Sequence, residues 1–432
     1  MRRRLALSVL VPFALLAAAC GGDDGAGDDE ATEATAPAAT FAPPSDAEPA
    51  DFSGRGPYAV GQIDLQLDPE HLVAVFYPVD ADVVPADAEP YSYSGEDLLD
   101  PTISALLPGS LSGEVAPADT WVGLPASDDG PFPTVLYSHG ASGNLRFASQ
   151  HNAAVASWGY LVASVDHPER GLASILDAFL AGSEDERERP DPYLDSDQLI
   201  AGLDLLAETN EQADSPIAGA VDTEQVAAEG LSAGGSSSGT VAYDDRVDLW
   251  IGQAPVTPLA PDTDLDAFTE EVEDEDGETR ERYDVDALLD ATTPPDVPSL
   301  IITAEGDTVL DLGWAMQTYD WLDSPKRLAV IADSGHAVYV DPCVPIRAEG
   351  GLSGFVESLG LDPDDVPFVE LGENGCLPSD TDPELVWGLI DHLTVAQLNQ
   401  VFGIDTDVAT ASLDPDYLDE TFPGLLQEIV TG

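Results

Sequence analysis

The sequence predicts an α/β fold in which helices flank a mostly parallel central sheet. From Gly54 onward, short runs of β-branched and other apolar residues alternate with longer helical patterns. The later runs are apolar at nearly every position, as expected of parallel strands that are buried on both faces. With 432 residues, 43% of them hydrophobic, the chain can bury one large core or two ordinary ones.

Eight segments have the length and composition of strands. In chain order they are 59–67, 72–78, 134–138, 160–166, 226–230, 248–253, 299–304 and 328–332. The turn sequence Asp68-Pro69-Glu70 predicts that the first two pair antiparallel. Helical patterns between the later strands, as at 197–208, predict the crossover helices of a parallel sheet.

Three stretches interrupt this alternation. Residues 171–195 contain a run of charged residues and are predicted to form an insertion, a possible lid, over one end of the sheet. Residues 258–295 are a second, strongly acidic insertion. Residues 343–432 are a C-terminal extension, in which the pattern at 383–402 predicts a helix with a core-facing apolar stripe.

The charge of the chain excludes some partners. It has 83 Asp and Glu residues against 14 Lys and Arg, and its net charge is −69. Nucleic-acid binding needs clustered basic side chains, so the sequence excludes it. The same field repels anionic lipid headgroups and keeps the protein soluble where salt screens its self-repulsion. Either export or adaptation to salt accounts for this composition.

The N-terminus resembles the signal peptide of a bacterial lipoprotein over residues 1–20. Three Arg residues precede an apolar stretch, Leu5 to Ala19, that is too short to span a bilayer and ends at Cys20. The resemblance implies cleavage before Cys20 and acylation of that Cys, hence a lipid anchor on the outer face of the bacterial cell membrane. A secretory signal cleaved near Ala19 is the alternative.

Residues 21–52 are rich in Ala, Pro, Glu and Asp and have no apolar periodicity. They are expected to form a disordered acidic tether, which leaves 53–432 as the folded domain. With Cys20 lipidated, Cys343 and Cys376 remain, and such a pair outside the cytosol predicts a disulfide. Two buried thiols are the alternative.

A G-x-S-x-G pentapeptide, Gly230-Leu231-Ser232-Ala233-Gly234, follows a predicted buried strand and opens a helix of small residues. A tight strand-to-helix turn of this kind exposes the Ser side chain at the end of the sheet. This context predicts that Ser232 is a nucleophile. A flexible Ser-Gly turn is the alternative.

A nucleophilic Ser needs a base, and the base needs an acid that orients it. Asp307 and His336 each follow a predicted buried strand, so both are expected at the sheet edge that carries Ser232. The order Ser, Asp, His along the chain is that of α/β-hydrolases. Glu305 and Asp311 compete with Asp307 for the role of the acid.

Two backbone amides are expected to stabilise the oxyanion of a tetrahedral intermediate. Ala233 follows the nucleophile at a helix N-terminus, and Ala141 follows Ser138-His139-Gly140 at the end of a strand. His139 itself is expected to be a structural loop residue. The other His residues besides His336 are interpreted as structural or solvated; they are His71, His151, His167 and His392.

Four segments carry a more specific resemblance: Gly56-Pro57-Tyr58-Ala59-Val60-Gly61, Tyr137-Ser138-His139-Gly140, Ala156-Ser157-Trp158-Gly159-Tyr160-Leu161-Val162-Ala163 and Gly230-Leu231-Ser232-Ala233-Gly234-Gly235. They resemble the group of α/β-hydrolases that contains platelet-activating-factor acetylhydrolases, dienelactone-hydrolase-like proteins and cutinase-like polyester hydrolases. The resemblance extends from Gly56 to His336. It implies a Ser-His-Asp triad, oxyanion amides at Ala141 and Ala233, ester hydrolysis and no cofactor.

The chain departs from two of these subgroups. The acetylhydrolase pattern places its acid after the strand that follows the nucleophile helix, where this chain has Gly252-Gln253-Ala254-Pro255. Asp307, one strand later, matches the other subgroups. Polyester hydrolases usually carry His before and Met after the nucleophile, where Leu231 and Ala233 stand. Neither a phospholipid nor a polyester is therefore favoured as the substrate.

Five acidic residues of the second insertion have the spacing of a calcium loop: Asp262, Asp264, Asp266, Glu270 and Glu273. Ala267, however, stands where the sharp turn of such a loop requires Gly. No Cys and His spacing typical of zinc occurs. The sequence therefore predicts neither a metal nor a cofactor.

These features predict a lipid-anchored, extracytoplasmic serine esterase. Its expected partners are a small-molecule or lipid-like ester and, through the anchor alone, a membrane. The negative surface favours neutral or cationic esters over anionic ones. The alternatives are a lipase, acetylhydrolase or polyester hydrolase of the same fold, and a surface lipoprotein that uses this fold for binding without turnover.

Overall fold

The structure is a computed structural model. It describes residues 41–42, 45–98, 114–171, 174, 191–273, 279–323, 325–358, 360, 362–363 and 369–432. The predicted signal peptide with Cys20, most of the predicted tether and most of the predicted lid at 171–195 lie outside the described residues.

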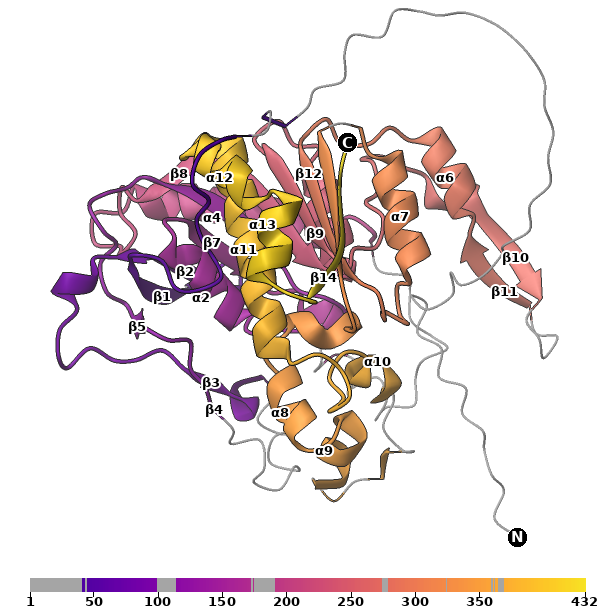
Figure 1. The fold of residues 1–432 in the computed structure, drawn as a ribbon, viewed down its shortest axis with the longest axis horizontal. Coiled ribbons are helices and arrows are strands. Elements are labelled where there is room, and N and C mark those ends of the chain that lie inside the picture. The colour runs from indigo at the N-terminus through magenta and orange to yellow at the C-terminus, as the bar shows by residue number, and fades with distance from the viewer. Residues whose placement is uncertain are drawn as a thin grey trace, which may run out of the picture.

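A ten-stranded sheet forms the centre of the described part (Figure 1). In spatial order its strands are β14 (Leu426–Thr431), β13 (Lys326–Ile331), β12 (Ser299–Ala304), β9 (Leu249–Gln253), β8 (Val221–Leu231), β6 (Phe132–Ser138), β7 (Leu161–Val165), β2 (Leu72–Val79), β1 (Ala59–Gln66) and β5 (Thr120–Val122). Neighbours from β13 to β7 are parallel, whereas β14 and β2 pair antiparallel with the strands beside them. The predicted fold class is confirmed.

All eight predicted strands are present, and most of their ends differ by only one or two residues. The largest difference is in β8, which begins at Val221, opposite Phe132 of β6, instead of at residue 226. Two strands of the sheet were not predicted, β5 at one edge and β14 at the other. β14 pairs with β13 at the edge of the sheet, where its half-exposed side chains alternate irregularly.

Helices cover both faces of the sheet. On one face lie α2 (Ser149–Ser157) and α11 (Pro383–Phe402). On the other face lie α4 (Leu194–Asn210), α5 (Ala233–Val241) and α7 (Leu312–Trp321). Their apolar side chains belong to two separate clusters, because the sheet divides the core into two layers. Figure 1 shows α11 crossing in front of the sheet.

The remaining helices are α6 (Val285–Ala291), α8 (Cys343–Ala348), α9 (Leu352–Ser358), α10 (Val369–Glu373), α12 (Thr406–Ser412) and α13 (Pro415–Thr421). Short 3-10 helices are η1 (Ala81–Val83), η2 (Gly95–Leu98), η3 (Pro168–Arg170), η5 (Leu265–Phe268) and η6 (His336–Tyr339). Two small two-stranded antiparallel sheets pair β3 (Tyr93–Ser94) with β4 (Glu114–Val115) and β10 (Thr269–Glu273) with β11 (Thr279–Tyr283). The acidic insertion therefore contains one of these two-stranded sheets followed by α6.

The C-terminal extension is part of the same domain. As predicted, α11 spans 383–402, and its side chains Val386, Leu389 and Leu393 are fully buried in the core. Leu385, which has the same apolar character, is instead 59% exposed. Because α11 covers one face of the sheet and β14 completes its edge, the segment 343–432 supplies core that the rest of the chain lacks.

The end of the predicted tether lies against this domain. Phe52 is 5% exposed, and its ring meets that of Trp158 edge to face with centroids 5.0 Å apart. Its backbone N–H donates to His392 Nδ1, and the N–H of Ala50 donates to Ser412 Oγ. Composition did not predict this contact, because a single buried aromatic ring anchors a segment that is otherwise polar and small.

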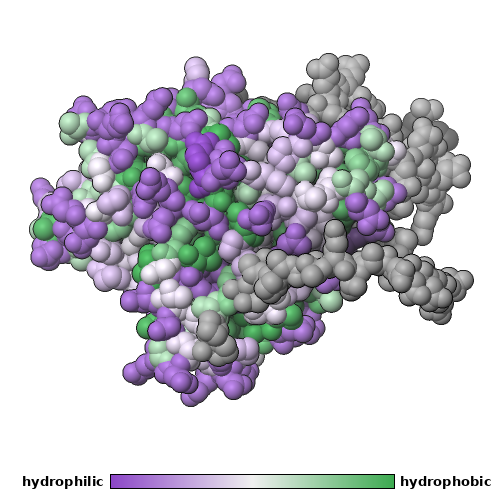
Figure 2. Space-filling view, turned by 90° about the horizontal axis from the view of Figure 1, so that it is seen from above, coloured by the Kyte–Doolittle hydropathy of each residue, from purple (hydrophilic) through white to green (hydrophobic). Residues whose placement is uncertain are grey.

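Hydrophilic residues cover most of the face shown in Figure 2, and the hydrophobic areas between them are scattered. The described helices include none that is long and apolar enough to cross a membrane. Within the same residues, no group of three or more His, Cys, Asp or Glu side chains is arranged to hold a metal ion.

A disulfide joins Cys343, at the start of α8, to Cys376. Both residues are completely buried, and their separation in sequence is 33. The pairing expected from the even number of remaining Cys residues is therefore present. It ties the loop that follows η6 to the segment that follows α10.

We expect the double substitution C343S/C376S to lower the free energy of unfolding by about 3 to 4 kcal/mol, because the unfolded chain regains the entropy of a loop of this length. Urea denaturation of the two proteins measures this difference. Wild-type protein treated with a reductant should move to the midpoint of the variant. Equal midpoints for the oxidised wild type and the variant would contradict the expectation.

Candidate active site

Ser232 lies at the sharp turn between β8 and α5. Its backbone angles, φ 56° and ψ −117°, are sparsely populated by residues other than Gly and are typical of a nucleophile elbow. Hydrogen bonds hold this conformation, since the Ser232 N–H donates to the Gln253 carbonyl (2.9 Å) and the Val256 N–H donates to the Ser232 carbonyl (3.1 Å). The side chain is partly exposed at the carboxyl end of the sheet.

Two Gly residues allow the turn to be this tight. A Cβ atom on Gly230 would lie 2.2 Å from the carbonyl oxygen of Gly234. A Cβ atom on Gly234 would lie 2.1 Å from the carbonyl oxygen of Ser138, at the end of β6. The glycines of the pentapeptide therefore bring the helix against both strands, which places Ser232 beside the loop that follows β6.

His336 lies within hydrogen-bond distance of both Asp307 and Ser232. The Nε2 atom of His336 is 3.1 Å from Ser232 Oγ, and its Nδ1 atom is 2.7 Å from Asp307 Oδ2. The other carboxylate oxygen of Asp307 accepts from the N–H groups of Val309 and Leu310, both at 2.8 Å. Asp307 is 4% exposed and His336 7%.

This arrangement determines the chemistry that the three groups can perform. An ionised Asp307 can only accept, so Nδ1 of His336 carries the proton and Nε2 is free to accept from the Ser232 hydroxyl. The competing acids lie elsewhere. Asp311 caps α7 by accepting from the Trp314 N–H (3.0 Å), and Glu305 is exposed.

The two predicted oxyanion amides belong to the elements that meet at Ser232. Ala233 is the first residue of α5, and Ala141 lies in the loop after β6. Neither N–H donates a hydrogen bond to any other group in the described part of the chain. A Cβ atom on Gly140 would lie 3.4 Å from that of Ser232, so the loop reaches the nucleophile.

His139 and His167 hold this loop, as the structural interpretation of His139 predicts. The backbone N–H of His167 donates to His139 Nε2 (3.1 Å), so the proton of the imidazole lies on Nδ1, which donates to the Gly140 carbonyl (2.8 Å). The Ser142 N–H donates to the carbonyl of Arg170, on the same loop as His167. The conformation around Ala141 is thus held from two sides.

A buried ionic cluster lies behind the nucleophile strand. His151 of α2 contacts Glu229 of β8 through Nε2 (3.1 Å) and Asp391 of α11 through Nδ1 (2.6 Å). Burial lowers the pKa of His151, but the two carboxylates outweigh that effect and raise it to about 10. The periodicity of the sequence did not reveal this cluster, because a lone His or Glu in an apolar pattern gives no sign of its partner.

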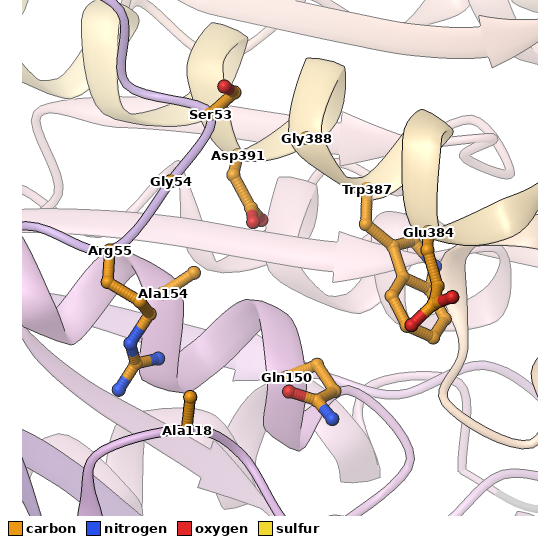
Figure 3. Close-up of a pocket in the computed structure, with 10 residues that line it drawn as sticks. All are labelled: Ser53, Gly54, Arg55, Ala118, Gln150, Ala154, Glu384, Trp387, Gly388 and Asp391. Carbon is orange, nitrogen blue, oxygen red and sulfur yellow. The ribbon is translucent and has the colours of Figure 1, made fainter.

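A cavity of about 220 Å³ borders this cluster (Figure 3). Arg55 on the N-terminal segment, Gln150 of α2 and Asp391 of α11 point into it, and the ring of Trp387 forms a wall. None of the side chains that line it belongs to the Ser232 site. The cavity therefore lies on the α2 and α11 face of the sheet, apart from Ser232.

Asp341, five residues after His336 in sequence, is buried beside Tyr93 and the N-terminus of α2. Burial raises its pKa to about 8, even though hydrogen bonds from Tyr93 and the backbone of α2 oppose the shift. A carboxyl group whose pKa is raised by folding binds more protons in the folded state. Its contribution to stability is therefore present at low pH and is lost as the pH rises from about 4 through 8.

We expect Asp341→Asn to remove this contribution. Relative to wild type, the variant should gain stability as the pH is raised from 5 to 8, because the neutral amide has no proton to lose. Urea midpoints of both proteins across this range measure the effect. Asp416→Asn, which makes the same replacement at an exposed helix start, is the matched control. If the free energies of unfolding of Asp341→Asn and wild type differed by the same amount at every pH from 5 to 8, that result would contradict a raised pKa for Asp341.

Comparison with known proteins supports the chemistry of this site. A model of the prolyl oligopeptidase family matches residues 195–343, about a third of the chain. That match includes Ser232, Asp307 and His336. No significant match was found among curated proteins. Together with the sheet and the elbow at Ser232, the family match identifies this protein as a serine hydrolase of the α/β-hydrolase superfamily.

Proposed function

We propose that this protein hydrolyses carboxylic esters through an acyl-enzyme formed on Ser232. The observation that carries the proposal is the pair of hydrogen bonds that joins Ser232 Oγ to His336 Nε2 and His336 Nδ1 to Asp307 Oδ2. These are the distances at which a hydroxyl can pass its proton to an imidazole and a carboxylate can stabilise the imidazolium that results.

In the first half of the reaction Ser232 Oγ attacks the ester carbonyl carbon while His336 takes the hydroxyl proton. The negative charge that develops on the carbonyl oxygen is stabilised by the N–H groups of Ala141 and Ala233, which have no other acceptor among the described residues. The bond to the alcohol then breaks as His336 returns the proton to the leaving oxygen. In the second half, water attacks the acyl-enzyme with His336 again as base, and the carboxylic acid leaves.

Peptide hydrolysis is the second candidate, because the matching family model is that of the prolyl oligopeptidase family. The same three side chains can cleave an amide, since His336 can protonate an amine as well as an alcohol. The ester proposal depends on the resemblance of the segments around Gly56, Tyr137 and Ser232 to ester-cleaving α/β-hydrolases.

A protein that begins at Gly21 provides the test. A fluorophosphonate should label it at Ser232, and p-nitrophenyl esters of increasing acyl length should be hydrolysed faster than blocked peptidyl anilides, including ones with Pro at the cleavage site. Faster cleavage of the anilides would favour peptide hydrolysis over ester hydrolysis as the function. Failure of folded protein to label would contradict both.

The net charge of −69 supports a preference for neutral or cationic esters. Turnover of a choline ester should therefore exceed that of a hemisuccinate with the same leaving group at low salt. Because salt screens exposed charges, the ratio should fall at high ionic strength. A ratio that does not depend on salt would show that contacts within the site, and not the field of the surface, set the preference.

We also propose that the enzyme is exported and held on the outer face of the cell membrane by acylated Cys20. The resemblance of residues 1–20 to a lipoprotein signal peptide and the disulfide between Cys343 and Cys376 support this location. Cells grown with labelled palmitate should label the wild type but not Cys20→Ser. Labelling of both would exclude this Cys as the anchor.

A further inference from the structure

The segment 369–377 touches both loops that carry the acid and the base of the candidate site. Asn374, directly after α10, uses its side chain as a bridge. Its Oδ1 accepts from the N–H groups of His336 (2.7 Å) and Thr308 (3.1 Å), and its Nδ2 donates to the Gly306 carbonyl (2.9 Å). One amide group therefore binds the backbone on either side of Asp307 and the backbone of the base itself.

The backbone of this segment also packs directly on the loop of the base. The Ala337 N–H donates to the carbonyl of Asn374 (2.7 Å). A Cβ atom on Gly335 would lie 2.6 Å from the Gly375 nitrogen and would collide with it. The two backbones thus approach as closely as Gly allows, so a shift of one segment moves the other.

The disulfide fastens the segment in this place. Cys376 follows Asn374 by two residues, and its partner Cys343 lies in the chain shortly after η6, which begins with His336. The segment 369–377, here called the brace, is thereby covalently joined to the far end of the loop that contains His336. Residues 369–377 belong to the C-terminal extension and lie outside the match to the prolyl oligopeptidase family.

We propose that Asn374 is a positioning residue, and that the disulfide-linked segment around it sets the distance between Asp307 and His336. The inference rests on the proposed function. Apart from the contact between Asp307 and His336 themselves, the described parts of the two loops are joined by backbone hydrogen bonds. The Gly306 N–H donates to the Ser334 carbonyl (2.8 Å), and where the strands end the Glu305 N–H donates to the Ile331 carbonyl (2.8 Å). Asn374 adds a second connection made of three hydrogen bonds to both loops.

Loss of this connection should affect turnover more than substrate binding. Asn374 contacts the loops and not the reacting atoms, so its effect acts through the geometry of the acid and the base. A misplacement of about 1 Å can cost on the order of 100-fold in rate. We expect Asn374→Ala to lower kcat about 10- to 100-fold while KM changes by less than about threefold.

A matched control separates positioning from a general loss of stability. Asn210, at the end of α4, also bonds the backbone through both side-chain atoms, accepting from the Val221 N–H (3.0 Å) and donating to its carbonyl (3.4 Å). Asn210→Ala should lower the unfolding temperature and leave kcat unchanged. Asn374→Asp keeps the acceptor and loses the donor to Gly306, so its kcat should lie between those of wild type and Asn374→Ala.

Hydrogen exchange gives a readout that does not depend on activity. The N–H groups of Thr308 and His336 are bonded to Asn374 Oδ1, so both should exchange faster in Asn374→Ala than in wild type. They should be unaffected in Asn210→Ala. In a double-mutant cycle, Asn374→Ala should cost less in the C343S/C376S background, because the segment is no longer fastened there.

The outcomes distinguish this proposal from the proposed function. Suppose that wild-type protein labels at Ser232 and turns over esters, but that Asn374→Ala has the same kcat as Asn210→Ala. The proposed function then holds, and the proposed positioning role of Asn374 is wrong. Unchanged exchange at Thr308 and His336 overturns it as well. If wild type neither labels nor turns over, the proposed function fails, and faster exchange in Asn374→Ala then leaves only a structural brace.

Discussion

Ser232→Ala is expected to lower kcat at least about 10⁴-fold and to abolish labelling by a fluorophosphonate. Ser232 Oγ lies 3.1 Å from His336 Nε2, as expected of a nucleophile beside its base. Activity that remains should come from the oxyanion amides and binding alone. The measurement is single-turnover hydrolysis of a p-nitrophenyl ester.

Ser236→Ala is the matched control for this loss. Ser236 lies on the same helix, and its hydroxyl donates to the Thr257 carbonyl (3.0 Å). Its replacement should leave the rate within a few-fold of wild type. Both variants should unfold close to wild type, because neither hydroxyl fills the core. Activity that survives in a folded Ser232→Ala protein would move the nucleophile elsewhere.

Asp307→Asn should lower kcat by about 10⁴-fold without unfolding the protein. The reason lies in the hydrogen bonds around the carboxylate. One oxygen accepts from the N–H groups of Val309 and Leu310, so the amide oxygen of Asn must occupy that position. Its NH₂ group then faces His336 Nδ1, which has to become an acceptor. The proton moves to Nε2, and the imidazole can no longer accept from the Ser232 hydroxyl.

Asp311→Asn provides the comparison for this variant. Asp311 was a sequence-based alternative for the acid, and in the structure it caps α7 through the Trp314 N–H. Asn caps helices about as well as Asp, so both activity and stability should be retained. Loss of activity in Asp311→Asn together with its retention in Asp307→Asn would reverse the assignment of the acid. Rates from the same ester assay decide between the two.

The location of the candidate site was predictable because its side chains follow buried strands. Parallel strands present their carboxyl ends at one edge of the sheet, so Ser232, Asp307 and His336 had to lie near one another once the strands before them were recognised. Position along the sequence could not separate Asp307 from Asp311, since both follow the same strand. The difference lies in which carboxylate faces the imidazole.

Other parts of the fold were not visible in local patterns. The contacts of Asn374 with both loops of the candidate site span 38 residues to His336 and 66 to Thr308. An Asn in an irregular segment has no periodicity, and its three hydrogen bonds are to backbone atoms, which every residue possesses. The docking of Phe52 and the pairing of β14 escaped prediction for a similar reason, because each depends on a surface that exists only after the sheet has formed.

The order of hydrophobic runs by itself determined the class of fold and the edge of the sheet at which the chemistry lies, because strand burial and chain connectivity leave few other topologies. The Cys count, with Cys20 assigned to the predicted anchor, predicted the pair Cys343 and Cys376. Only the tertiary structure decided which carboxylate contacts the His336 imidazole, which segment supports the two loops of the candidate site, and where Phe52 of the N-terminal segment packs. Those outcomes depend on contacts of a few ångströms between residues far apart in the chain, and no local periodicity encodes them.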